Sequence, residues 1–148
     1  MPSLSIPSPV GQLVLDEADG ALVAIRWAEE RAANGSPFLA EAARQLEAYF
    51  AGKLTDFDLP LRPAGSDFQR RVWAGMQAIP YGQTRSYGEL AADIGSAPRA
   101  VGGACGKNPI PIVIPCHRVL ARTGFGGYSG SGGLETKQTL LALEGALG

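Results

Sequence analysis

Residues 108–119 restrict the possible folds more than any other stretch, because an apolar, β-branched run there contains three prolines. Proline fixes φ and has no backbone N–H, so Pro109, Pro111 and Pro115 disfavour a central strand. The run is also too hydrophobic for an exposed loop. We therefore predict that this stretch is rigid and buried. It would hold in place the thiol, imidazole and guanidinium at its end, at residues 116–118.

Cys116 and His117 are the residues in this stretch with reactive side chains. A thiolate is a strong nucleophile, and a cation, a helix N-terminus or an acid–base partner lowers the thiol pKa from roughly 8.5. Successive residues of an extended chain point to opposite faces, so a direct contact of Cys116 with His117 requires a turn or a bridging water. Free cysteines are also common as small core residues, and the residues alone leave both interpretations open.

Composition indicates a globular chain with enough apolar residues for a core. It has 148 residues, 45% of them hydrophobic, which suits one ordinary domain or two small ones. No apolar run approaches the ~18 residues of a membrane span, and the start of the chain does not resemble a signal peptide, so we expect a cytoplasmic protein. Two cysteines and one histidine predict neither a disulfide framework nor a zinc site.

Charge is distributed unevenly along the chain. Residues 1–64 carry nine acidic and five basic side chains, a net −4, whereas residues 65–148 carry five acidic and eight basic ones, a net +3. A basic half is typical of nucleic-acid binding, although solvated surface charge would give the same numbers. The asymmetry therefore supports a DNA or RNA partner without identifying one.

The first half predicts a small antiparallel sheet and one helix. Strands within residues 3–28 flank Asp19-Gly20, a pair suited to the positive φ angles of a tight hairpin turn. Ser36 and Pro37 then begin a helix with one apolar face, and Gly52 ends it. The aperiodic residues 53–65 place a domain boundary after residue 64.

The second half predicts a helix-turn-helix of winged-helix type, so the fold class is α+β. Capping boxes at residues 66–69 and 86–89 begin two helices, and Gly95 ends the second. A further helix follows Pro98 and reaches about Lys107. Cys105, on this last helix, is predicted to be a packing residue.

The last of these helices carries almost no side chains on one side. Its small residues are Ala100, Gly102, Gly103 and Ala104, and each glycine costs about 1 kcal/mol of helix propensity. Such a bare side allows close approach to another surface. Close packing of the helix inside the protein would explain it equally well, and the sequence leaves both explanations open.

Several motifs in this order resemble the O6-alkylguanine-DNA alkyltransferases. The most specific is Pro115-Cys116-His117-Arg118-Val119. The others lie at residues 68–73, 79–84, 86–91, 99–104, 108–111 and 127–130. The resemblance is close from about residue 67 to 145 and loose before that, where it implies a ribonuclease-H-like domain over residues 1–64.

The resemblance implies a single-turnover methyltransferase that needs no cofactor. Cys116 would attack the alkyl carbon of O6-alkylguanine, and of O4-alkylthymine, in a flipped-out base, and the resulting thioether would consume the protein. His117 would activate the thiol through water, and Glu144 would orient the imidazole. Tyr87 would donate a proton to N3 of the leaving base. A buried Glu144 requires a partner, for which protonated His117 is the expected candidate.

The resemblance also implies a DNA-binding face and a substrate pocket. The helix-turn-helix residues assigned to DNA are Ser86, Tyr87, Arg99, Ala100, Gly102 and Gly103, with Arg99 filling the place of the flipped nucleotide. Asn108 matches a hinge between this face and the active-site segment. The residues assigned to the pocket wall are Pro115, Val119, Tyr128 and Ser129. The family pattern is about two residues shorter than this chain at Gly130-Ser131-Gly132-Gly133. This difference affects the assignment of Ser129 to the pocket wall.

The implied partner is double-stranded DNA containing O6-alkylguanine, bound by a monomer, with cooperative binding left open. Three other functions compete with this one. A damage-recognition module would bind the lesion without transfer, but such proteins typically lack the cysteine. A Cys-His hydrolase or acyltransferase would need no DNA. A transcription regulator would need several groove-reading polar side chains, and only Arg99 and Lys107 are available.

Overall fold

The computed structural model describes residues 2–121 and 133–146. Contacts divide the chain into two compact units, Met1–Ala64 and Gly65–Gly148. The α+β architecture expected from the sequence is confirmed, with a sheet in the first unit and a group of short helices in the second.

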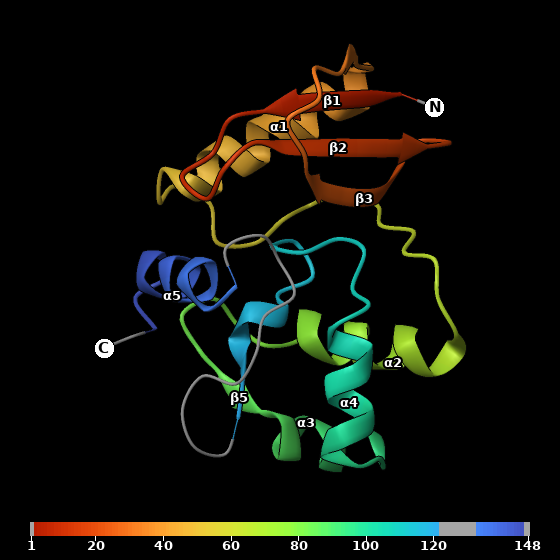
Figure 1. Ribbon diagram of the computed structural model, residues 1–148, viewed down its shortest axis with the longest axis vertical. Coiled ribbons are helices and arrows are strands. Elements are labelled where there is room, and N and C mark those ends of the chain that lie inside the picture. Colours follow the sequence, from red (N-terminus) through yellow and green to blue (C-terminus); the bar gives the residue numbers. More distant parts are fainter. Residues whose placement is uncertain (1, 122–132, 147–148) are drawn as a thin grey trace. The chain divides into compact units, whose positions relative to one another are not determined.

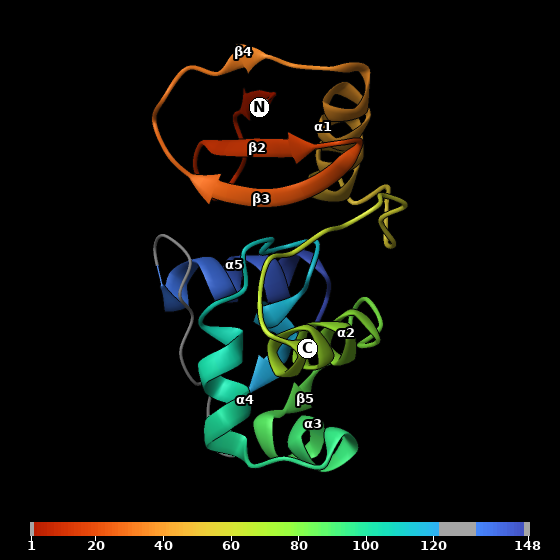
Figure 2. The same cartoon turned by 90° about the vertical axis from the view of Figure 1, so that its right-hand side faces the viewer.

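The first unit is a four-stranded antiparallel sheet with one helix on one face (Figures 1 and 2). Its strands, in the spatial order β3-β2-β1-β4, are β1 (Ser3–Ile6), β2 (Leu13–Ala18), β3 (Ala21–Trp27) and β4 (Ala33–Asn34). The predicted hairpin joins β2 to β3, with Asp19 and Gly20 both at positive φ. Helix α1 (Pro37–Phe50) begins at Ser36, whose hydroxyl accepts a hydrogen bond from the Leu39 backbone N–H.

Two backbone pairings at the edges of this sheet were not predicted. β4 pairs with β1, and the connection after α1 runs beside β3, where Leu22 N–H donates to Pro60 O and Arg62 N–H donates to Leu22 O, each at 2.9 Å. Both are non-local pairings of short segments without a strand pattern of their own. The connection between the units is therefore partly ordered by the sheet.

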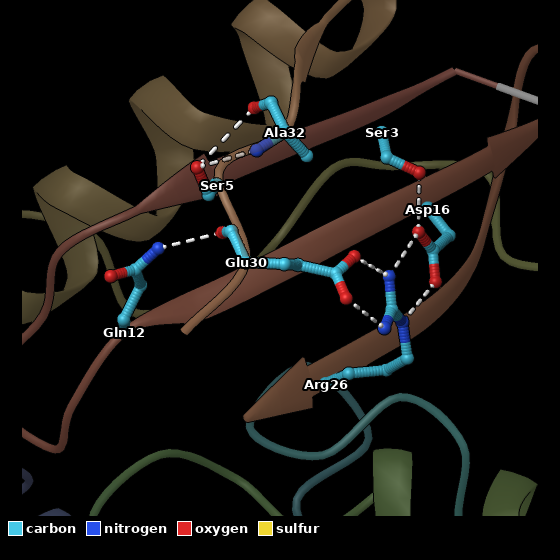
Figure 3. A network of polar contacts seen from close by, with 7 residues as sticks. All are labelled: Ser3, Ser5, Gln12, Asp16, Arg26, Glu30 and Ala32. Carbon is cyan, nitrogen blue, oxygen red and sulfur yellow. Dashed lines mark hydrogen bonds and ion pairs between the residues drawn. The ribbon is translucent and has the colours of Figure 1, made fainter. Parts of the chain in front are cut away.

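A polar network ties the segment after β3 to the sheet (Figure 3). Arg26 on β3 binds Asp16 through Nε at 2.6 Å and Glu30 through Nη2 at 2.8 Å. Burial opposes ionisation of Asp16, but hydrogen bonds from Arg26 and Ser3 lower its pKa overall. The network contains no nucleophile or acid–base pair, so we assign it to folding.

The second unit groups α2 (Asp67–Gln77), α3 (Tyr87–Ile94) and α4 (Pro98–Cys105) against one another. Both predicted capping boxes form, at Ser66 with Gln69 and at Ser86 with Glu89. Gly95 ends α3 at a φ of 70°. Trp73 is a core residue, 1% exposed, and its indole N–H donates to Ala104 O at 2.9 Å.

Two short segments connect these helices to the remainder of the unit. β5 (Arg85–Ser86) pairs in parallel with β6 (Val119–Leu120), which follows the 3-10 turn η1 (Cys116–Arg118). α5 (Leu134–Leu143) packs against η1. The β5–β6 pair places the start of α3, at Tyr87, close to the segment that carries Cys116.

Candidate active site

Residues 108–115 form a turn and not a ladder strand, as the three prolines led us to expect, and residues 110–115 are buried. Ile114 N–H donates to Ile110 O at 2.9 Å, and Ile112 takes a φ of 76°, which is rare for a β-branched residue. Asn108 closes the turn from both sides: its Nδ2 donates to Ile114 O at 2.8 Å, and its Oδ1 accepts from Ile110 N–H at 3.0 Å. The side chain of Asn108 thus connects the end of α4 to the residues before Cys116.

We expect replacing Asn108 with alanine to destabilise the second unit by about 2 kcal/mol, because a buried N–H and a buried C=O would lose their partners. Urea unfolding followed by Trp73 fluorescence, in a Trp27→Phe background, measures this unit alone. Gln83→Ala, which removes an exposed amide in the same unit, is the control. A loss of unfolding free energy equal to that of the control would contradict a structural role for the two Asn108 side-chain hydrogen bonds.

Cys116, His117 and Arg118 follow in the η1 turn, where Arg118 N–H donates to Pro115 O at 3.0 Å. All three are buried, with exposed fractions of 6%, 0% and 6%. The chain turns here, so the opposite-face geometry of an extended segment does not apply. Neither Cys116 nor Cys105 is in a disulfide.

Glu144 caps the C-terminus of α5 and is bound by both His117 and Arg118. Its Oε2 lies 2.8 Å from His117 Nε2 and accepts from Arg118 Nη2 at 3.0 Å, while its Oε1 accepts from Arg118 Nε at 2.8 Å. The expected burial of Glu144 is observed, with its side chain 0% exposed. Its cationic partner, however, is Arg118, which the sequence analysis had not placed in the site.

His117 is the expected partner of Glu144, but the carboxylate has a second partner, Arg118, whose charge is permanent. Burial lowers the pKa of His117, and the opposing effect of the Glu144 carboxylate does not overcome it. Glu144 Oε2 can only accept while the carboxylate is ionised, so a neutral imidazole in this contact donates from Nε2 and keeps its lone pair on Nδ1. Nδ1 is buried and has no hydrogen-bond partner among the described residues.

Lys137 is a second buried cation near the site. It is 0% exposed, its Nζ donates to Val119 O at 2.7 Å, and it lies 5.9 Å from the centre of the Tyr87 ring. Burial lowers its pKa. Lys137 is not among the site residues expected from the sequence. Its seven-residue spacing from Glu144, two helical turns, was the signal that both point the same way.

Tyr87, the first residue of α3, is half-buried. Burial, followed by the nearby Cys105 and Cys116, raises its pKa to about 12. The phenol is therefore protonated at neutral pH and can donate a hydrogen bond. Cys105 lies in the core with its Sγ 3.4 Å from Met76 Sδ, and burial raises its pKa to about 12, which fits the predicted packing role.

The helix-turn-helix face carries an open pocket of about 790 Å³. Among the predicted DNA-binding residues, those that line it are Ser86, Tyr87, Arg99 and Gly102. Ala100 and Gly103 are exposed on α4 but are not part of the pocket lining. The structure thus gathers four of the six predicted residues in one hollow.

The two glycines of α4 are not in close contact with the other described residues. A Cβ added at Gly102 or at Gly103 would meet no atom of the described structure within 4 Å. Gly75 in α2 shows the opposite case, since a Cβ there would lie 2.7 Å from Leu90 Cδ1. Packing inside the described structure therefore does not require glycine at 102 or 103.

The predicted pocket wall is described in part. Pro115 and Val119 are buried beside Cys116, whereas Tyr128 and Ser129 lie outside the described residues, as do residues 130–132 of the lengthened loop.

Among the described residues, no group of His, Cys, Asp and Glu side chains could hold a metal ion. No described helix has the length and apolar character needed to cross a membrane.

The fold and the site together define a class: a protein with a helix-turn-helix unit that buries a cysteine next to a histidine–glutamate pair. Residues 67–146 match the family described as 6-O-methylguanine DNA methyltransferase, DNA binding domain, and residues 4–63 match its ribonuclease-like domain. The chain belongs to this family.

Named relatives agree with this assignment. Methylated-DNA--protein-cysteine methyltransferase of Mycolicibacterium paratuberculosis is 51% identical over 95% of this chain and 90% of its own length. The protein of that name from Methanosarcina acetivorans is 44% identical over 94% and 95%. The crystal structure of Mycobacterium tuberculosis OGT in complex with DNA is 46% identical, with a TM-score of 0.88, and the match covers 99% of this chain and 94% of that one.

Proposed function

We propose that this protein repairs DNA by transferring the alkyl group from O6 of guanine to the sulfur of Cys116. The observation that carries the proposal is the burial of Cys116 beside a His117–Glu144 pair, in the unit that matches the family's DNA-binding domain. The names of the relatives support the same reaction. A second substrate of the same chemistry is O4-alkylthymine.

His117 is the base that activates the thiol. Glu144 accepts from Nε2–H, which leaves the Nδ1 lone pair to take the thiol proton through a water molecule. The thiolate attacks the alkyl carbon, the carbon–O6 bond breaks, and its electron pair passes to the guanine. Water does not hydrolyse a thioether, so each molecule acts once.

Tyr87 donates to the guanine as the leaving base gains charge. A phenol whose pKa is about 12 is protonated at neutral pH, and its place at the first turn of α3, on the wall of the pocket, is compatible with contact to a base. Lys137 lies next to this phenol and holds Val119 O. We assign Pro115, Val119, Tyr128 and Ser129 to the wall of the substrate pocket.

α4 approaches the DNA backbone through its bare side. The open space at Gly102 and Gly103 supports this assignment, because the glycines lower helix stability without serving packing in the described structure. Ser86, Arg99 and Ala100 flank this side. Arg99 fills the gap left by a base that rotates into the pocket, at a cost of a few kcal/mol for unstacking. Asn108 is the hinge between this helix and the Cys116 turn.

The test is the intact mass of the protein after incubation with an oligonucleotide that contains one O6-methylguanine. We expect one methyl group per molecule, in proportion to the lesion added, and peptide mapping should place it on Cys116. Cys116→Ser should gain none and still bind the DNA. Cys105→Ala, which changes the other cysteine, should be methylated normally.

Two outcomes would contradict the proposal. Binding of the lesion without a mass increase in the unmutated protein would indicate a damage-recognition module. Neither binding nor transfer, together with turnover of a thioester or amide substrate, would indicate a hydrolase.

A further inference from the structure

The Arg118 side chain has more contacts with Glu144 than His117 has. Its Nε and Nη2 bind the two carboxylate oxygens at 2.8 and 3.0 Å, and its Nη1 donates to Ile79 O at 2.7 Å. The guanidinium also lies 5.8 Å from the centre of the Tyr81 ring. This bidentate ion pair is buried, because the side chains of Arg118 and Glu144 are 7% and 0% exposed.

The charges around His117 favour a neutral imidazole. An arginine stays protonated at any pH at which proteins fold, so the Glu144 charge is already balanced before His117 is considered. Lys137 on α5 adds a second positive charge. The buried residues of α2, which also packs on η1, are Val72, Trp73 and Met76, and none of them titrates. A proton added to His117 would therefore meet two cations and a carboxylate that is already paired.

We propose that Arg118 is a positioning residue for alkyl transfer: by pairing with Glu144, it keeps the His117 imidazole neutral, with its proton on Nε2 and its lone pair on Nδ1. This inference rests on the proposed function, because the Nδ1 lone pair matters only if His117 receives the thiol proton. Without Arg118, the unbalanced Glu144 carboxylate would draw a second proton onto the imidazole.

The consequence is a change in the pH dependence of alkyl transfer. In an Arg118→Met variant the pKa of His117 should rise. The variant loses a positive charge that lowers this pKa, and the Glu144 carboxylate, which raises it, no longer has the arginine as a partner. Protonated His117 cannot accept the thiol proton, so the rate should fall at acidic and neutral pH and recover at higher pH. We expect the acid limb of the pH profile to move up by about one pH unit.

A purely structural role for Arg118 predicts a different result. Arg118 also holds Ile79 O, so its loss could loosen the site and lower the rate equally at every pH. Single-turnover rates at saturating oligonucleotide, measured across the pH range, separate the two cases. Arg118→Lys keeps the charge and should keep the acid limb near its original position, even if its rate is lower. Arg70→Met, which removes an exposed arginine of the same unit, should leave the profile unchanged.

His117 is the only histidine of the chain, so its protonation can be observed directly. Nitrogen-15 NMR of the imidazole in the unmutated protein at neutral pH should show a protonated Nε2 and an unprotonated Nδ1. A doubly protonated ring, or a proton on Nδ1, would overturn the proposal even if Arg118→Met does not fold. So would a uniform loss of rate with an unmoved acid limb. The NMR result needs no alkyl transfer, so it remains informative if the proposed function fails.

Discussion

Replacing Glu144 with glutamine is expected to destabilise the second unit by about 3–5 kcal/mol, the range found when one partner of a buried ion pair is removed. The change preserves shape but leaves the Arg118 guanidinium buried without a counter-charge. It also weakens the hydrogen bond that fixes His117. The effect is large because neither oxygen of Glu144 reaches solvent.

Urea unfolding monitored by Trp73, again in a Trp27→Phe background, measures the loss. Glu135→Gln is the matched control, since Glu135 lies in the first turn of the same helix and is exposed. Its effect should stay below about 1 kcal/mol, the size of a charge–dipole interaction at a helix end. Adding Arg118→Met to Glu144→Gln should restore part of the stability, because it removes the unpaired charge. Equal losses in the two glutamine variants would contradict the buried ion pair.

Placing leucine at Gly102 is expected to change stability and DNA binding in opposite directions. The new side chain starts from open space and replaces a poor helix former, so the free energy of unfolding should rise by about 0.5–1 kcal/mol. If α4 lies against DNA, the same side chain blocks close approach. We expect the affinity for lesion-bearing DNA to fall by tenfold or more, a loss of at least about 1.4 kcal/mol.

Fluorescence anisotropy of a labelled oligonucleotide and urea unfolding of the same samples test this pair of effects. Ala74→Leu adds an exposed leucine to α2 instead and controls for non-specific effects of apolar surface. It should leave DNA affinity unchanged. If Gly102→Leu binds DNA as well as the unmutated protein does, then α4 is not the surface that approaches DNA. A loss of stability would contradict the free space around Gly102.

Features that depend on neighbours in the chain were predictable from the sequence. The capping boxes at Ser66 and Ser86, the Asp19-Gly20 hairpin and the Gly95 helix end all follow from side-chain and backbone geometry within four residues. The three prolines likewise showed that residues 108–115 would not form a ladder strand. The family motifs placed Cys116, His117 and Glu144 on the list of site residues.

Features that depend on distant segments were not predictable. The β4 edge and the pairing beside Leu22 join stretches that carry no strand period, and the parallel β5–β6 pair joins segments more than thirty residues apart. Arg118 was recognisable only as part of a motif, because its partner Glu144 lies at the end of another helix. Lys137 was not expected in the site, because its burial depends on reaching a carbonyl of β6.

The sequence alone therefore determined which residues could do the chemistry, since the nucleophile, the imidazole and the glutamate are identified by type and motif. Only the tertiary structure showed that Arg118, and not His117 alone, is the ion-pair partner of Glu144. This pairing depends on burial and on the geometry of three side chains from two segments, where the planar guanidinium binds both oxygens and the imidazole binds one. The tertiary structure likewise showed that no described atom lies within 4 Å of a Cβ added at Gly102 or Gly103, because the surroundings of a helix face are set by the elements packed around it.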